Sequence, residues 1–261
     1  MQGVVAVSAQ TNPVEQSNEE VRPFTDLTLE IVVPERTVLS LQPIPIVIRQ
    51  SNKTNQLAMG YKAIVFGFTP FRLFAKKIGS NEKVPIGRQS ALLHYAVFFN
   101  VKLAPGESCE TKGWITIGLH RYFPEPGTYE IQAGLTNNDG SQYIESNKVT
   151  VEIKMPTGAD HNAYNLIKNN SFEDFLFSGH KFDKAKGILE TLTVTHPNTP
   201  YAKSASFLLG ESHFNQKQYQ QALKNLIRLE NDRDFIFADK VRDYIDEIQE
   251  LLQQQTVLEN Q

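Results

Sequence analysis

Residues 196–229 read HPNTPYAKSASFLLGESHFNQKQYQQALKNLIRL, and this stretch decides how the carboxy-terminal part of the chain is interpreted. Apolar and small side chains recur every three or four positions in each half. They are Ala202, Ala205, Leu208 and Leu209 in the first half, and Tyr219, Ala222, Leu223 and Leu226 in the second. Thr199 and Pro200 stand where a helix cap and a first-turn proline belong, and residues 215–218 are polar. The stretch therefore predicts two antiparallel helices joined by a short turn.

Two small residues indicate how closely these helices approach. Gly210 and Ala222 fall on the stripes that face each other, where a leucine would hold the helices apart. We therefore expect direct contact between the two helices at these positions.

The same stretch resembles the tetratricopeptide repeat (TPR), a helix-turn-helix unit of about 34 residues. The resemblance is carried by Leu209, Gly210, Ala222 and Leu226, and a copy of the second helix upstream is carried by Phe182, Ala185, Leu189, Leu192 and Pro197. The large aromatic residue usual near the start of the first helix is missing, and His213 stands where tyrosine is usual. The joint HPNTPYA resembles those of bacterial periplasmic and outer-membrane TPR proteins. The resemblance implies a binding role at the cell envelope.

The amino-terminal part of the chain changes to an alternating pattern, with Leu27, Leu29, Ile31 and Val33 on one side of a predicted strand. Further strands are predicted at 44–49, 61–68, 92–101, 113–119, 128–136 and 143–153. Proline, glycine and asparagine residues separate them. About seven strands with this punctuation indicate an antiparallel sandwich.

One motif in this part resembles bacterial immunoglobulin-like domains. Residues 126–129 read Pro-Gly-Thr-Tyr and lead into the alternating Ile131, Ala133 and Leu135. The resemblance implies that Tyr129 is a corner tyrosine, with a buried ring and a hydroxyl bonded to the backbone. It supports a fold more than a function.

Together these patterns predict a two-domain protein of the all-β plus all-α class. The predicted order is an immunoglobulin-like antiparallel β-sandwich followed by a short TPR-like helical array. The predicted segments are a flexible leader (1–23), the sandwich (24–155), a linker (156–158), the helical domain (159–253) and a frayed tail (254–261). A short helix is also expected from Ser171 onward, and each domain is expected to have its own core.

Composition excludes several classes of function. The 261 residues are 40% hydrophobic and 21% charged, as in an ordinary globular protein, and the net charge of −3 offers no general attraction to nucleic acid. The single cysteine, Cys109, excludes an internal disulfide and a CxxC site. No apolar run approaches the roughly 20 residues that a membrane-spanning helix needs.

The first ten residues, MQGVVAVSAQ, leave two interpretations open. Val7-Ser8-Ala9 has the small-residue character of a signal-peptidase site, but a basic region before it is absent. A truncated signal peptide and a disordered terminus both fit. Together with the envelope-type joint, the first interpretation predicts an exported protein, periplasmic or associated with the cell envelope.

Catalytic and cofactor motifs do not appear in the sequence. The six histidines have no zinc-type spacing, so we predict no metal and no cofactor. Asp160-His161 is better explained by helix capping than by a catalytic dyad. Trp114 lies in an alternating segment and is expected in the core. An enzyme would need a site assembled only in three dimensions, for example around His94 or His120.

Residues 69–89 form a segment longer than a hairpin needs, and its basic residues outnumber its acidic ones. Arg72, Lys76 and Lys77 are therefore candidate contacts for an acidic partner or an anionic envelope polymer. A solvated insertion is the alternative. The same segment could act as the inhibitory loop of a protease inhibitor.

A second candidate surface lies on the predicted helix that precedes residue 215. By three-four spacing, Ser204, Phe207, Glu211 and Phe214 share one stripe away from Gly210. Partner binding there is one interpretation, and packing of Phe207 and Phe214 against a neighbouring repeat or the last helix is the other. The leading hypothesis is a non-enzymatic, exported scaffold or adaptor that binds proteins.

Overall fold

The computed structural model describes eight ranges of the chain. These are residues 26–63, 71–80, 83–84, 86–89, 98–118, 124–136, 143–169 and 182–259. The predicted leader with its signal-peptide remnant, the helix expected from Ser171, and both His94 and His120 lie outside them. Export therefore remains a prediction.

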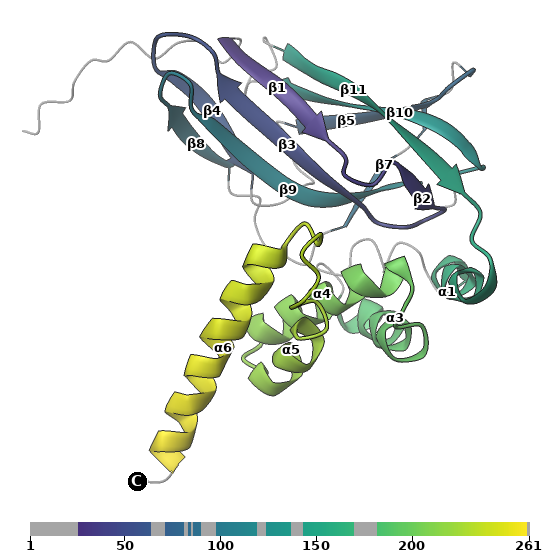
Figure 1. The fold of residues 1–261 in the computed structure, drawn as a ribbon, viewed down its shortest axis with the longest axis vertical. Helices are drawn as coiled ribbons and strands as arrows, with labels where there is room; N and C mark the ends of the chain where they lie inside the picture. The colour runs from purple at the N-terminus through teal and green to yellow at the C-terminus, as the bar shows by residue number, and fades with distance from the viewer. Residues whose placement is uncertain are drawn as a thin grey trace, which may run out of the picture.

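Within the described residues, the strands form three sheets (Figure 1). The strands are β1 (Leu27–Val32), β2 (Thr37–Leu39), β3 (Ile44–Asn52), β4 (Ala58–Ala63), β5 (Phe71–Lys77), β6 (Lys83–Val84), β7 (Ile86–Gln89), β8 (Phe98–Leu103), β9 (Ser108–Ile117), β10 (Gly127–Thr136) and β11 (Tyr143–Lys154). One sheet has the order β1-β3-β9-β7, a second has the order β2-β11-β10-β5-β6, and β4 pairs with β8. All pairs are antiparallel except β2 with β11, which is parallel.

The two larger sheets enclose one apolar core. Its residues include Ile31, Ile46, Ile48, Ile115, Tyr129, Ile131 and Val151, which come from both sheets. The period of two in the sequence places these side chains on one face of each strand, because successive residues of a strand point to opposite faces. The strands predicted at 27–33, 44–49, 128–136 and 143–153 are confirmed with small shifts at their ends.

Tyr129 occupies the position that the resemblance implied. Its ring is fully buried, and its hydroxyl donates to the backbone oxygen of Glu125 at 2.7 Å. This bond ties the segment before β10 to the core and removes the cost of burying an unpaired hydroxyl.

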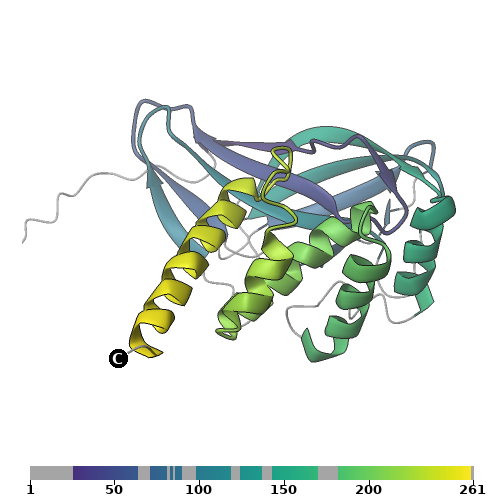
Figure 2. The same ribbon diagram turned by 60° about the horizontal axis from the view of Figure 1, so that its bottom comes forward.

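The helices of the described residues lie on one side of the sheets. They are α1 (Gly158–Asn169), α3 (Phe182–Thr195), α4 (Pro200–Asn215), α5 (Tyr219–Leu226) and α6 (Ala238–Glu259). Figure 2 shows them following one another along the sheets, with α1 and α6 at opposite ends. The last helix, α6, continues past Gln253 to Glu259, and the expected fraying of residues 254–261 stays a prediction.

The contact predicted between α4 and α5 is confirmed. A Cβ built on Gly210 would lie 2.5 Å from Cγ of Leu226 in α5, closer than real carbon atoms approach. Thr199 is the N-cap residue of α4, in extended conformation ahead of Pro200, but its hydroxyl donates to the oxygen of His196 and accepts no hydrogen bond from the first turn of the helix. The polar turn at 215–218 is also confirmed, with Lys217 in the left-handed region at φ 59°.

The predicted fold class, an all-β domain followed by a separate all-α TPR array, is wrong. The apolar core of the helices contains Trp114 of β9 and Leu41 of the β2–β3 connection. Helix and strand are about equally represented, and the sheets and helices form a mixed α/β arrangement. The spacing within residues 196–229 predicted the packing of α4 on α5, which is observed. That spacing does not predict what covers the other sides of these helices.

A second connection joins the sheets to the helices beside Trp114. Leu41 adopts a φ of 63°, a conformation that costs a residue with a Cβ about 1–3 kcal/mol. Its side chain is buried among the helices, and the neighbouring Ser40 oxygen accepts a 2.7 Å hydrogen bond from the Tyr201 hydroxyl of α4. Apolar burial and a buried hydrogen bond thus hold the strained turn against the helical layer.

The segment 69–89 was interpreted from the sequence either as a docking surface or as a solvated insertion, and most of its described residues lie in strands. Its described residues form β5 in one large sheet, β6 beside it, and β7 at the edge of the other sheet. A segment that crosses between two sheets needs more residues than a hairpin, which explains its length.

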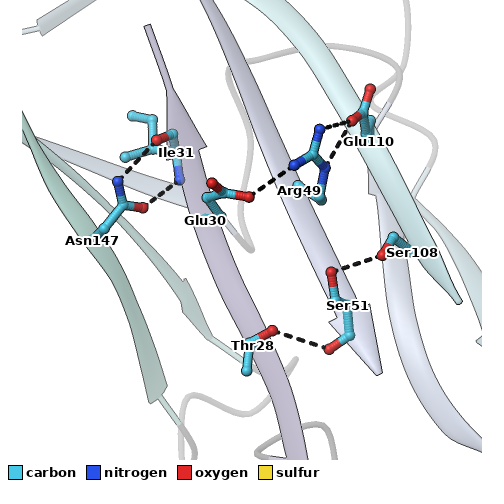
Figure 3. Close-up of polar contacts among 8 residues, drawn as sticks. All are labelled: Thr28, Glu30, Ile31, Arg49, Ser51, Ser108, Glu110 and Asn147. Atoms are coloured by element: carbon cyan, nitrogen blue, oxygen red, sulfur yellow. Dashed lines mark hydrogen bonds and ion pairs between the residues drawn. The ribbon is translucent and has the colours of Figure 1, made fainter. Parts of the chain in front are cut away.

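The outward face of the four-stranded sheet has an exposed end that carries two cross-strand polar rows (Figure 3). In one row, the Arg49 guanidinium donates to Glu30 at 2.9 Å and to Glu110 at 2.7 Å. In the other, the hydroxyls of Ser51 and Ser108 lie 2.7 Å apart. These pairs are in register across β1, β3 and β9.

The side chain of Asn147 closes part of the edge of this sheet (Figure 3). Its Oδ1 accepts from the Ile31 amide at 2.8 Å, and its Nδ2 donates to the Ile31 oxygen at 3.1 Å. A side chain from β11 thereby takes the place of a further strand beside β1. Such pairing protects an edge strand from addition of another chain.

Candidate binding cleft

A cleft of about 190 Å³ lies where the four-stranded sheet meets the helices. Residues from the β2–β3 region, from β9, from the start of α4 and from the segment before α6 line it. They are Glu35, Gln42, Pro43, Pro45, Trp114, Pro200, Lys203, Ser204, Asp234, Phe235 and Ile236. Segments far apart in the sequence therefore build one concave site.

The apolar wall of the cleft is centred on Trp114. This residue pairs with Pro45 across β9 and β3, so both side chains are on the outward face of the sheet. The Trp114 ring lies 5.4 Å from Phe207 and 5.7 Å from Phe235, in edge-on and tilted arrangements. Such aromatic contacts contribute beyond area burial and hold the indole in one orientation. The wall is therefore a packed cluster of aromatic rings.

The sheet side of the rim is organised by Gln42. Its Oε1 accepts from the Leu39 amide at 2.8 Å, and its Nε2 donates to Oε2 of Glu35 at 2.7 Å. Gln42 is buried, whereas Glu35 is exposed at the mouth. A fixed amide thus orients one oxygen of an exposed carboxylate.

The helical side of the rim carries three charges. Lys203 forms an ion pair with Asp232 at 2.7 Å. Asp234 is exposed, and within the described part of the chain it has no hydrogen-bond or ion-pair partner. The hydroxyl of Ser204 donates to the Tyr201 oxygen at 3.2 Å. Two carboxylates, Glu35 and Asp234, consequently remain as uncompensated negative charges around the cleft.

The four residues of the predicted helix stripe lie in α4, where Ser204, Phe207 and Glu211 are buried and Phe214 is half-buried. Ser204 lines the cleft. Phe207 stacks on Phe237 with ring centroids 4.9 Å apart, and Phe214 lies 4.7 Å from Tyr244 of α6. The packing alternative for the two phenylalanines is therefore the one observed. Partner binding by the stripe stays a prediction.

Glu211, the third residue of the stripe, is a buried carboxylate with two partners from α6. It forms an ion pair with Lys240 and accepts a 3.0 Å hydrogen bond from the Tyr244 hydroxyl. Burial, and then the charge of Glu211, raise the pKa of Tyr244 far above its ordinary value. Lys240 also lies over the rings of Phe207 and Tyr244. These contacts attach α6 to α4.

The basic residues predicted as partner contacts are not brought to the cleft. Arg72, Lys76 and Lys77 all belong to β5 in the five-stranded sheet, and the first two are exposed. Lys77 forms a 2.7 Å ion pair with Glu125, whose carboxyl pKa is lowered by the hydrogen bond and the positive charge. Binding of an acidic partner at Arg72 and Lys76 remains a prediction.

The structure also places Trp114, Asp160 and His161, which the sequence analysis discussed. Trp114 is buried, as expected, but on the outward face of its sheet and not between the sheets. Asp160 lies in the first turn of α1, and among the described residues no hydrogen bond joins it to His161. Among those same residues, no group of three His, Cys, Asp or Glu side chains is placed to hold a metal ion.

None of the helices in the described ranges of the chain is both long and apolar enough to cross a bilayer.

Sequence reasoning missed most of the cleft because each residue has an ordinary local explanation. The three prolines at 43, 45 and 200 fit a strand start and a helix start, and Glu35 and Asp234 fit solvated turns. One signal was available in β9. Its outward positions change from charged at Glu110 and Lys112 to bulky at Trp114, which indicates that another layer covers that end.

Comparisons with known proteins do not assign the chain to a family. No family model matches it, and no curated protein matches it. Among solved structures, a β-glucosidase from Listeria innocua is similar over 49% of this chain and 16% of its own, with 12% identity and a TM-score of 0.29. A FixG-related protein from Vibrio parahaemolyticus is similar over 50% of this chain and 98% of its own, with 13% identity and a TM-score of 0.25.

A third structure, AvmM, which catalyses macrocyclization in alchivemycin A biosynthesis, is similar over 56% of this chain and 97% of its own. Its identity is 10% and its TM-score is 0.26. The chain thus spans less than a fifth of the β-glucosidase. All three TM-scores are too low for an argument about fold or function.

Proposed function

We propose that this protein is a non-enzymatic binding protein that holds part of another protein in the cleft between its four-stranded sheet and its helices. The observation that supports the proposal is a concave site with a tightly packed apolar wall around Trp114 and a polar rim organised by Gln42. Binding sites commonly combine an apolar lining with a few oriented polar groups.

The size of the cleft favours a side chain over a metabolite or cofactor. Its volume of about 190 Å³ is below the roughly 300–1,000 Å³ of sites that enclose drug-sized molecules. A protein partner can insert one anchoring residue into such a site while the rest of its contact spreads over the rim.

The chemistry of the lining favours binding over catalysis. The Ser204 hydroxyl donates to a backbone oxygen, and the Lys203 ammonium is engaged with Asp232. A serine nucleophile needs an adjacent base to take its proton, and the Ser204 hydroxyl donates to a backbone oxygen instead.

A selection of peptides from a displayed random library, with the full chain as target, tests the proposal. The affinity of each selected peptide is then measured by fluorescence anisotropy for two variants. Asp234→Trp places an indole at the cleft, and Asp243→Trp makes the same change at an exposed position of α6. We expect the first to weaken binding about tenfold or more, as loss of an anchoring contact does, and the second to leave it unchanged.

Equal affinities for the two variants, or a selection that yields no binding peptide, would contradict a binding role for the cleft. Circular dichroism of both variants provides the control for folding.

A further inference from the structure

We propose, on the basis of the binding function proposed above, that the residue inserted into the cleft is an arginine of the protein partner. The cleft combines a narrow apolar volume with two uncompensated carboxylates at its mouth. That combination matches a side chain with an apolar stem and a cationic planar end.

The charges around the cleft determine the sign of the occupant. Glu35 and Asp234 each contribute one negative charge, and the Lys203 ammonium is paired with the Asp232 carboxylate at 2.7 Å. With the Lys203–Asp232 pair counted as neutral, Glu35 and Asp234 leave two negative charges. An anionic group such as phosphate would be repelled, and a neutral apolar residue would desolvate the carboxylates without a partner.

The orientation of Glu35 favours a directional donor. Its Oε2 accepts from the Gln42 amide at 2.7 Å, and the buried Gln42 is held in turn by the Leu39 amide at 2.8 Å. The second carboxylate oxygen has no partner among the described residues. The carboxylate is thus oriented in advance, so less freedom is lost when a donor binds.

The wall of the cleft distinguishes arginine from lysine. Trp114, Phe235 and the prolines provide flat apolar surfaces, against which a guanidinium stacks well because it is planar and weakly hydrated. Its several N–H groups provide donors for both the Glu35 and the Asp234 carboxylate. An ammonium is compact and strongly hydrated, and it leaves the flat surfaces unused.

The test uses peptides from the displayed library and the full chain. Each selected peptide is resynthesised with its arginine replaced by lysine and by methionine. We expect an arginine in the selected consensus, weaker binding with lysine, and a loss of about tenfold or more with methionine.

The matched protein variants separate charge from shape. Glu35→Gln together with Asp234→Asn removes both carboxylates of the cleft at constant size, and Asp243→Asn together with Asp246→Asn removes two exposed carboxylates of α6. The first pair is expected to weaken binding of the arginine peptide about tenfold or more, and the second pair less than about twofold.

The outcomes separate the two proposals. One outcome would overturn the arginine assignment and leave the binding cleft intact. In it, the selected peptides lose affinity for Asp234→Trp but bind the double variant Glu35→Gln with Asp234→Asn unchanged, and replacement of their arginine by methionine has no effect. Peptides insensitive to Asp234→Trp would overturn both.

Discussion

The two ends of the outward face of the four-stranded sheet differ in what covers them, although the same strands build both. At one end, Glu30, Arg49 and Glu110 form an exposed ionic row. At the other end, Trp114 faces in the same direction but is buried against three phenylalanines of the helical region. Whether a side chain on the outward face is buried therefore depends on the layer that covers that part of the sheet.

This difference explains why the helices are not a separate array. The alternation of β9 directs Trp114 away from the core between the sheets. If the helices had a closed core of their own, Trp114 would therefore be exposed. Instead, one large apolar side chain from the sheet completes the core of the helices. The candidate cleft lies at this covered end, where Trp114 and the prolines at 43, 45 and 200 line it.

The largest effect is expected from Trp114→Ala at the covered end. Removal of a buried indole costs about 3–5 kcal/mol of the free energy of unfolding, because a cavity remains between sheet and helices. Urea unfolding measures it. Arg49→Ala at the exposed end is the matched change, and it is expected to have little effect on the free energy of unfolding because its ion pairs are solvated. Equal costs at the two ends would contradict the shared core.

Gly210→Leu is the next change in expected size, and it tests the packing inside the helical layer. The new side chain would overlap Leu226, so we expect a loss of about 1–3 kcal/mol in the free energy of unfolding. Gly187→Leu in α3 is the control, because its Cβ would meet no atom within 4 Å. The control is expected to be neutral or slightly stabilising, since glycine is a weak helix former. Thermal melting of both variants decides the matter.

Lys240→Met removes the positive partner of the buried Glu211 carboxylate. We expect a loss of about 1–3 kcal/mol, because that carboxylate keeps only the Tyr244 hydroxyl. Arg242→Met, on the same helix, breaks an exposed pair with Asp239 and is expected to cost about 0–1 kcal/mol. Thermal melting compares the two variants. Equal melting temperatures would show that the attachment of α6 does not depend on the buried pair of Lys240 and Glu211.

The smallest effect is a pH dependence that comes from Tyr244. Its pKa is raised in the folded protein, so its contribution to stability is complete below the unfolded value of about 10 and is lost as the pH rises toward the folded value. The unfolded chain releases the proton first. Urea unfolding between about pH 9 and 11 should therefore show a smaller decline in stability for Tyr244→Phe than for the unchanged protein. Parallel declines would show that Tyr244 is not the source.

Local features of the fold follow from the sequence, and the layer arrangement does not. The contact at Gly210 and the buried Tyr129 were predictable, because each depends on spacing within a short segment. The position of Trp114 was predicted only as buried. Alternation assigns a side chain to one of two faces, and it cannot say which element covers the outward face.

The candidate cleft was less predictable than the fold. Its lining joins Glu35 and Gln42 with Ser204 and Asp234, and no periodicity links positions so distant in the chain. Short strands were missed for a related reason. β2 has three residues and pairs in parallel with β11, so its position depends on the tertiary structure and not on its own pattern.

Urea unfolding of the full chain with two probes tests the central claim that the four-stranded sheet, through Trp114, shares the core of the helices. Trp114 is the only tryptophan of the sequence, so its fluorescence reports the contact between β9 and the helices, while far-ultraviolet circular dichroism reports mainly the helices. A shared core predicts that both signals change in one coincident transition. Two separated transitions, with the helical signal lost at a different urea concentration from the Trp114 signal, would contradict the claim.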